Sequence, residues 1–221
     1  MARGNLPAVA AQLASVGQRF YARGWALGTS GNFSAVLSRR PLRLAITASA
    51  VPKGQLRATH ILEIDENGSI VGRKAGRPSA ETLLHVEIAR LRGAGAVLHT
   101  HSVWTTVLSD LYAGDGGLTI EGYEMLKGLK GVASHEHREW IPVIQNDQDM
   151  PRLVGRVRET LEEFADAHAF LLCRHGLYTW GDTLMDAERH VEILEFLFET
   201  LGRVRMMTPK DGLSGGTPWR Y

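Results

Sequence analysis

A long helical pattern near the C-terminal end is the feature that most constrains the fold of this chain. Apolar residues recur there at steps of three and four, the spacing that places side chains on one face of an α-helix: Leu184, Ala187, Val191, Leu194, Phe198 and Leu201. A shorter pattern of the same kind runs from Val9 to Phe20. A helix with one apolar face is stable when that face covers another apolar layer. The residues between these two helices must therefore provide such a layer.

Short apolar runs of strand length fill the middle of the chain. They cover residues 33–37, 42–47, 61–65, 96–98, 141–144, 169–173 and 177–180. After the run at 61–65, Glu66-Asn67-Gly68 predicts a hairpin that returns through residues 69–72. Helical segments are predicted at 79–91, from Val103, at 123–127 and at about 151–168. Strands flanked by helices at both ends predict an α/β fold, with a central mixed sheet covered on two faces.

No repeat, low-complexity tract or long linker divides the 221 residues. We therefore expect a single domain over residues 1–221, with its core at about 7–205 and an irregular Gly- and Pro-rich tail at 208–221. A chain of this size hides roughly 70% of its unfolded surface on folding. A core of that extent needs no disulfide to stabilise it.

Composition excludes several classes of partner and compartment. Lys and Arg number 25 against 24 Asp and Glu, for a net charge of +1, and no basic run marks a nucleic-acid binder. No apolar stretch approaches the roughly 20 residues of a membrane span. The one cysteine, Cys173, cannot form an internal disulfide, which favours the reducing cytoplasm. Its neighbours Leu171 and Leu172 predict a buried, unreactive thiol.

The strongest local signal for chemistry is a pair of histidines at the end of an apolar run, His99-Thr100-His101 after Ala96-Val97-Leu98. Side chains two apart on a strand project to the same face, so both imidazoles can lie side by side. Imidazole is a ligand of zinc and other divalent first-row metals. The alternative is that one histidine belongs to the core and the other faces solvent. Spacing alone does not choose between these.

A catalytic zinc needs a third protein ligand and an open position. His175 is a candidate, because it follows a second apolar strand and precedes a glycine. His135 and His137 form another His-x-His pair, but their neighbours are polar and no apolar strand leads into them, so we interpret them as a solvated loop. The remaining histidines of interest are interpreted as structural or exposed: His85 and His190 within helices, His168 near a helix end and His60 in a turn.

Carboxylates and polar turns supply the other candidate groups. Glu81 lies in the first turn of the helix predicted after Ser79, where a carboxylate also suits the helix dipole. Glu124 is equally compatible with an ordinary exposed acid, and the pattern does not separate the two as proton carriers. Anions could bind to the backbone and short polar side chains at residues 30–32 and 47–50, and at Ser79 at a predicted helix N-terminus. Each of these segments is also an adequate turn or cap.

Five motifs occur together in chain order: residues 28–34 (Gly-Thr-Ser-Gly-Asn-Phe-Ser), 46–49 (Ile-Thr-Ala-Ser), 78–81 (Pro-Ser-Ala-Glu), 99–101 (His-Thr-His) and 174–176 (Arg-His-Gly). With them the chain resembles the class II aldolase/adducin family from about residue 7 to residue 205. The resemblance implies a three-layer α/β/α fold whose mixed sheet is largely antiparallel. It also implies one zinc ion per subunit and a homotetramer with active sites near subunit interfaces.

The resemblance also assigns roles to individual residues. His99, His101 and His175 fall on the metal positions of the family. Glu124 falls where the dehydratases of the family carry their acid/base, and Glu81 falls where the aldolases carry theirs. The phosphate contacts of the family fall on Asn32, Ser49 and Ser79.

Within the family the longest matches, at residues 92–102, 123–128 and 174–181, are to the dehydratases of methionine salvage. The resemblance therefore implies zinc-dependent removal of water from a small-molecule ketose 1-phosphate that carries a methylthio group. One alternative is a class II aldolase or epimerase acting on a sugar phosphate of the fuculose or ribulose type. A remote alternative is a non-enzymic interaction module like the adducin head. Retention of all three metal-position histidines argues against that module.

Overall fold

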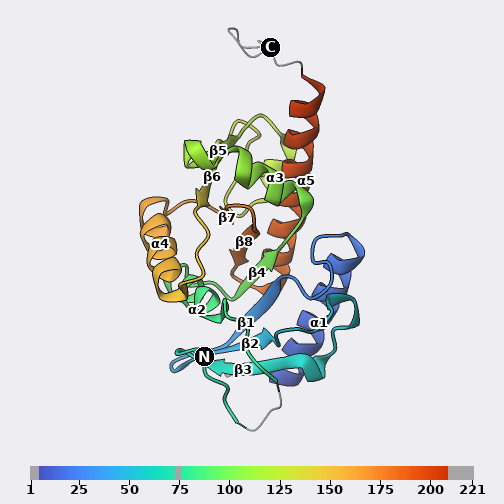
Figure 1. The fold of residues 1–221 in the computed structure, drawn as a ribbon, viewed down its shortest axis with the longest axis vertical. Helices are drawn as coiled ribbons and strands as arrows, with labels where there is room; N and C mark the ends of the chain where they lie inside the picture. Colours follow the sequence, from blue (N-terminus) through green and yellow to red (C-terminus); the bar gives the residue numbers. More distant parts are fainter. Residues whose placement is uncertain (1–4, 73–75, 209–221) are drawn as a thin grey trace.

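The computed structural model describes residues 5–72 and 76–208 (Figure 1). An eight-stranded sheet forms its centre, in the order β3-β2-β1-β4-β8-β7-β6-β5. Its strands are β1 (Asn32–Arg39), β2 (Leu42–Thr47), β3 (Ile61–Asp65), β4 (Ala96–Thr100), β5 (Gly117–Ile120), β6 (Glu139–Ile144), β7 (Ala169–Leu172) and β8 (Gly176–Gly181). The α-helices are α1 (Leu6–Ala22), α2 (Thr82–Leu91), α3 (Val103–Leu111), α4 (Met150–Glu163) and α5 (Leu184–Met207). Short 3₁₀ helices are η1 (Lys53–Gln55), η2 (Ala58–His60), η3 (Ala113–Asp115) and η4 (Glu124–Gly128).

The sheet is mixed and largely antiparallel, as the resemblance implied. Only the pairing between β6 and β7 is parallel. Strand β4 lies between β1 and β8, and one row of paired residues crosses all three strands: Asn32 opposite His99, and His99 opposite Tyr178. This row places a predicted metal ligand at the centre of the sheet, next to a predicted phosphate contact.

Alternation of side chains along the strands divides the core into two layers. On β2, Leu44 and Ile46 pack with Leu84 of α2 and Val157 of α4. Ala45, between them in sequence, belongs to the opposite layer, which α1 and α5 cover. Figure 1 shows α2 and α4 on one side of the sheet and α1 and α5 on the other. The fold is therefore the expected three-layer α/β/α arrangement.

The C-terminal helical pattern forms α5, the 24-residue helix on which Ala187, Val191, Leu194 and Phe198 are buried. Its apolar face therefore covers the sheet as the spacing predicts. Cys173 is also buried, in agreement with the prediction. No helix within the described ranges has an apolar stretch long enough to cross a membrane.

The structure differs from the sequence predictions in a few elements. Strand β5 is not predicted, because only two of its four residues have large apolar side chains and it follows a glycine-rich turn. The return strand at 69–72 is reduced to one bridge between Ile64 and Ile70. Helix α4 ends at Glu163 rather than near residue 168. Apart from Thr208, the predicted irregular tail lies outside the described residues.

Gly95 is the tightest backbone approach in the central part of the sheet. Its N–H donates to Gly181 and its carbonyl accepts from Val36, both at 2.8 Å, so it links the neighbours of β4 on either side. A β-carbon at this position would collide with the carbonyl oxygen of Asp182. In contrast, Gly155 on α4 has no atom within 4 Å of such a carbon.

We predict that Gly95→Ala lowers the free energy of unfolding by about 1–3 kcal/mol, the usual cost of overpacking. Gly155→Ala is the matched control, and it should raise the free energy of unfolding by about 0.5–1 kcal/mol because alanine loses less backbone entropy in a helix. Denaturant unfolding followed by circular dichroism measures both. Equal stabilities of the two variants would contradict the proposed close approach.

Candidate metal centre

His99 is a fully buried imidazole whose orientation is fixed by the sheet. It lies on β4 with its ring stacked on Tyr178 of β8, with 3.9 Å between ring centroids. Its Nδ1 is 2.8 Å from the carbonyl oxygen of Leu177. A carbonyl can only accept a hydrogen bond, so Nδ1 carries the proton and Nε2 presents a lone pair.

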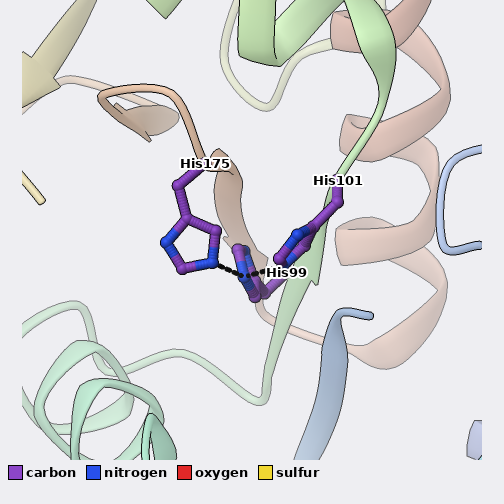
Figure 2. Close-up of side chains that lie close together, drawn as sticks. All are labelled: His99, His101 and His175. Carbon is purple, nitrogen blue, oxygen red and sulfur yellow. Dashed lines mark hydrogen bonds between the residues drawn. The ribbon is translucent and has the colours of Figure 1, made fainter. Parts of the chain in front are cut away.

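His101 and His175 bring two more imidazoles to that lone pair. Figure 2 shows the three rings turned toward one another, His99 and His101 from the end of β4 and His175 from the turn between β7 and β8. The Nε2 atom of His99 is 2.7 Å from that of His101 and 3.3 Å from that of His175. The three side chains offer ligand atoms that all lie within 4.8 Å of one another. We call this group the histidine triad.

The donor set of the triad fits a divalent metal ion. Burial is the main cause that lowers the pKa of His101 to about 4 and that of His99 well below its usual value. Both rings are therefore neutral near pH 7, as metal ligands must be. Three imidazoles that converge on one point form the ligand set of a catalytic zinc site, which leaves a fourth position open.

A carboxylate lies beside the triad. The Glu81 oxygens are 3.1 Å from Nε2 of His175 and 3.7 Å from Nε2 of His99. Burial by itself would raise the pKa of Glu81, but electrostatic interaction with His99 and His175, together with hydrogen bonds from His175 and Asn32, outweighs it and holds the pKa below its usual range. Glu81 is therefore an ionised group within reach of anything the triad binds.

Asn32 holds Glu81 in place and is itself held by a buried histidine. The Nδ2 atom of Asn32 donates to Glu81 at 2.7 Å and to Ser79 at 3.1 Å. Its Oδ1 contacts Nε2 of His85, whose other nitrogen contacts Ser34 at 2.8 Å. His85 thereby sets the direction of the Asn32 amide. These contacts keep Ser79 and Glu81 beside β1, and α2 begins only at Thr82 rather than at the predicted Ser79.

The three predicted phosphate contacts line a single cavity. Asn32, Ser49 and Ser79 enclose a space of about 140 Å³ together with Glu81 and His101. The cavity therefore adjoins the triad. Three separated loop segments that were each a weak anion signal in the sequence come together here.

Lys53 also lines this cavity, and sequence analysis missed it. Only 1% of its surface is exposed, and its Nζ donates to the carbonyl oxygens of Thr29 at 2.9 Å and Val51 at 3.2 Å. Burial lowers its pKa to about 8 while the charge of Glu81 opposes that change, so the ammonium is still charged near pH 7. The only signal in the sequence is its position four residues after Ser49, in the loop that follows β2.

Gly31 explains how the cavity and the triad come to adjoin. It has φ +74°, and a β-carbon there would be 2.6 Å from the backbone oxygen of His99. Only glycine combines that backbone conformation with so close an approach. The loop before β1 is therefore pressed directly against the strand end that carries two of the triad histidines.

Helix α5 supports the same strand end from the opposite face. Thr100, between His99 and His101, donates from its hydroxyl to Glu195 at 2.8 Å. Burial raises the pKa of Glu195 to about 7. Because side chains alternate along a strand, this contact of Thr100 with α5 directs the side chains of His99 and His101 to the opposite face.

Glu124 lies outside the triad within this chain. It begins the 3₁₀ helix η4, and 73% of its side chain is exposed. Its carboxylate contacts Lys127 at 2.7 Å and His135 at 3.8 Å. The two carboxylates that the sequence left undecided therefore have different settings, Glu81 beside the triad and Glu124 on the surface.

Some of the histidines predicted to be structural or exposed lie as predicted, and others make a contact that was not predicted. His135 is exposed, and Nδ1 of His60 accepts from the backbone of Arg57 within a turn, both as predicted. His137 lies in the predicted loop but is only partly solvated, because its side chain is 33% exposed and its Nε2 is 2.7 Å from the buried carboxylate of Glu139. His168 contacts that carboxylate from the other side at 2.9 Å. The parallel strands β6 and β7 create this contact, which no local pattern shows.

Comparison with known proteins agrees with the geometry. Residues 11–201 match the family model described as the class II aldolase and adducin N-terminal domain. A relative from Methylococcus capsulatus, named methylthioribulose-1-phosphate dehydratase, is 47% identical over 86% of this chain and 91% of its own length. A relative of the same name from Pseudomonas fluorescens is 42% identical over 92% of this chain and 97% of its own length.

Among solved structures, YgbL from Escherichia coli, for which aldolase, epimerase and decarboxylase are the candidate activities, superimposes with a TM-score of 0.75. It is 25% identical, and the match covers 98% of this chain and 94% of YgbL. The family model, the named relatives and the shared fold agree over nearly the whole described chain. The chain belongs to the class II aldolase and adducin family.

Proposed function

We propose that this protein dehydrates 5-methylthioribulose 1-phosphate to 5-methylthio-2,3-dioxopentyl phosphate, a step of methionine salvage. The observation that carries the proposal is the histidine triad beside an anion cavity, in a chain 42–47% identical to relatives named for this activity. The chemistry needs a group that polarises a carbonyl, a holder for the phosphate and a base. The chain offers candidates for each.

We propose that the phosphate binds in the cavity lined by Asn32, Ser49 and Ser79, with Lys53 as its cation. A buried ammonium that is already held by two carbonyls can donate its remaining N–H to a phosphate oxygen. Binding the phosphate there fixes the carbon chain relative to the neighbouring triad.

His99, His101 and His175 would hold a zinc ion, which when bound supplies Lewis-acid polarisation of the substrate carbonyl. The residues around it prepare the site. The carbonyl of Leu177 keeps the lone pair of His99 available, and Asn32 orients the Glu81 carboxylate toward His175.

Dehydration removes the proton of C3 and the hydroxyl of C4. The C4–O bond breaks as the C3–H electron pair forms the new double bond, and the proton and hydroxide leave as one water. The resulting enol then becomes the 2,3-diketone.

We propose Glu124 as the acid/base, with Glu81 as the second candidate. Because Glu124 is on the surface, this assignment requires that it reach the triad of a neighbouring subunit, and we propose a homotetramer as the assembly that brings the two together. We place this enzyme in the cytoplasm.

The first test is the product. Zinc-loaded protein incubated with 5-methylthioribulose 1-phosphate should form a 2,3-diketone phosphate by loss of one water, followed by NMR and mass spectrometry. Cleavage of the carbon chain into two fragments would instead make the protein an aldolase, the activity for which Glu81 would be the expected base. Unchanged substrate would refute the proposed substrate.

The second test separates the two carboxylates. Glu124→Gln should retain zinc and lower kcat by about 10²–10⁴-fold, the range for loss of a general acid/base. Glu121→Gln, which changes a nearby exposed acid paired with Arg138, is the matched control and should leave kcat unchanged. If Glu124→Gln is active while Glu81→Gln keeps its zinc but not its turnover, the base is Glu81.

The third test concerns the phosphate cavity. Lys53→Met should raise KM, and the inhibition constant of inorganic phosphate, about 10- to 100-fold, because a hydrogen bond to a charged group contributes about 1.5–3 kcal/mol. The value of kcat should change little, since the interaction is made equally in the ground and transition states. Lys130→Met, an exposed lysine paired with Asp182, is the control. An unchanged KM in Lys53→Met would remove Lys53 from the phosphate site.

A further inference from the structure

We propose that His137, Glu139 and His168 form a second divalent-cation site, separate from the histidine triad. Glu139 begins β6, and His168 immediately precedes β7. Because these two strands are parallel, both residues lie at the same end of the strand pair. His175 of the triad follows the other end of β7, so the length of the strand separates the two groups.

Two imidazole nitrogens converge on one carboxylate oxygen. The Oε2 atom of Glu139 is 2.7 Å from Nε2 of His137 and 2.9 Å from Nδ1 of His168. All three ligand atoms lie within 4.8 Å of one another, as they do in the triad. Two imidazoles and one carboxylate form a ligand set that binds zinc and other divalent metals in proteins.

Neighbouring backbone groups orient two of the three ligands. Nε2 of His168 donates to the carbonyl oxygen of Lys130 at 2.7 Å and Nδ1 donates to the Glu139 carboxylate, so a cation at the cluster would replace the proton on Nδ1. The backbone N–H of His168 donates to Oε1 of Glu139 at 3.0 Å, which turns Oε2 toward the two imidazoles. Metal-binding histidines are commonly held by such a second hydrogen bond, and His99 has the same arrangement with Leu177.

The cluster is closed on one side and open on the other. The side chain of Glu139 is 2% exposed, that of His168 15% and that of His137 33%. A cavity of about 540 Å³ adjoins His137 and His168, which gives a cation a path in and leaves room for water ligands. His190 also lines this cavity, but both of its nitrogens are engaged by backbone groups of Lys130 and Trp180.

Occupation of this site would fasten the segment that carries Glu124. That segment is tied to the loop of His137 through a hydrogen bond from the N–H of Gly122 to the carbonyl of His135, at 3.0 Å. A cation held by His137, Glu139 and His168 would join this loop to the starts of β6 and β7. The second site is therefore a structural clamp and takes no part in binding substrate.

The test is the zinc content of the full-length protein. Protein stripped with a chelator, reloaded with Zn²⁺ alone and desalted should contain two zinc ions per chain by mass spectrometry of the metal. His137→Gln should contain one, because glutamine can still donate to Glu139 but is a poor zinc ligand. His135→Ala, two residues away and exposed, is the matched control and should contain two.

The triad is tested separately, so that the two proposals can fail independently. His101→Ala should lose one zinc and retain the other, and the double variant His101→Ala/His137→Gln should contain none. Wild-type protein reloaded with Co²⁺ should also show a visible absorption component that is retained in His101→Ala and lost in both variants that carry His137→Gln. Two results would overturn the second site. One is a wild-type protein with one zinc per chain and a His101→Ala variant with none; the other is a His137→Gln variant that still contains two zinc ions.

Discussion

The hydrogen bond from His99 to the carbonyl of Leu177 is the interaction on which the rest of the site depends. It lies in the middle of the sheet, where β4 is paired on both sides, and it selects the nitrogen that faces the other two histidines. Because the ring is fully buried, no solvent water can take the place of this hydrogen bond and stabilise the other tautomer. Strand pairing, which is a property of the backbone, thereby determines the chemistry of a side chain.

Around this bond the molecule uses neutral hydrogen-bonding groups to position charged ones. His85 directs the amide of Asn32, and that amide directs the carboxylate of Glu81. Backbone carbonyls likewise hold the ammonium of Lys53. Each charge is buried, and each is satisfied by partners that do not neutralise it. The charges therefore remain available to a ligand. A direct ion pair between Glu81 and Lys53 would remove that availability.

Sequence patterns predicted a mixed sheet covered on two faces and allowed His99 and His101 to lie side by side, because these features depend on periodicity and on spacing two along a strand. The largely antiparallel pairing was implied by the family resemblance. His175 could be proposed because its surroundings repeat those of the first pair. Lys53 could not, since its importance comes from burial among carbonyls of two loops. The contact of Glu139 with His168 joins positions 29 apart through parallel strands, and no local pattern reports strand neighbours. The place of Glu124 also needed the structure, because an exposed acid and a catalytic acid look alike in sequence.

The close approach of Gly31 to His99 has a consequence for which isomers of a substrate can react. The loop that lines the cavity beside the triad and the strand end that carries the imidazoles are in backbone contact, with no side chain between them to deform. The two cannot separate without breaking the pairing between β1 and β4, so the distance between them is fixed. If the phosphate and the metal bind as proposed above, this fixed distance sets the number of carbons between the phosphate and the carbonyl, and a sugar phosphorylated at its far end would present the wrong atom to the imidazoles.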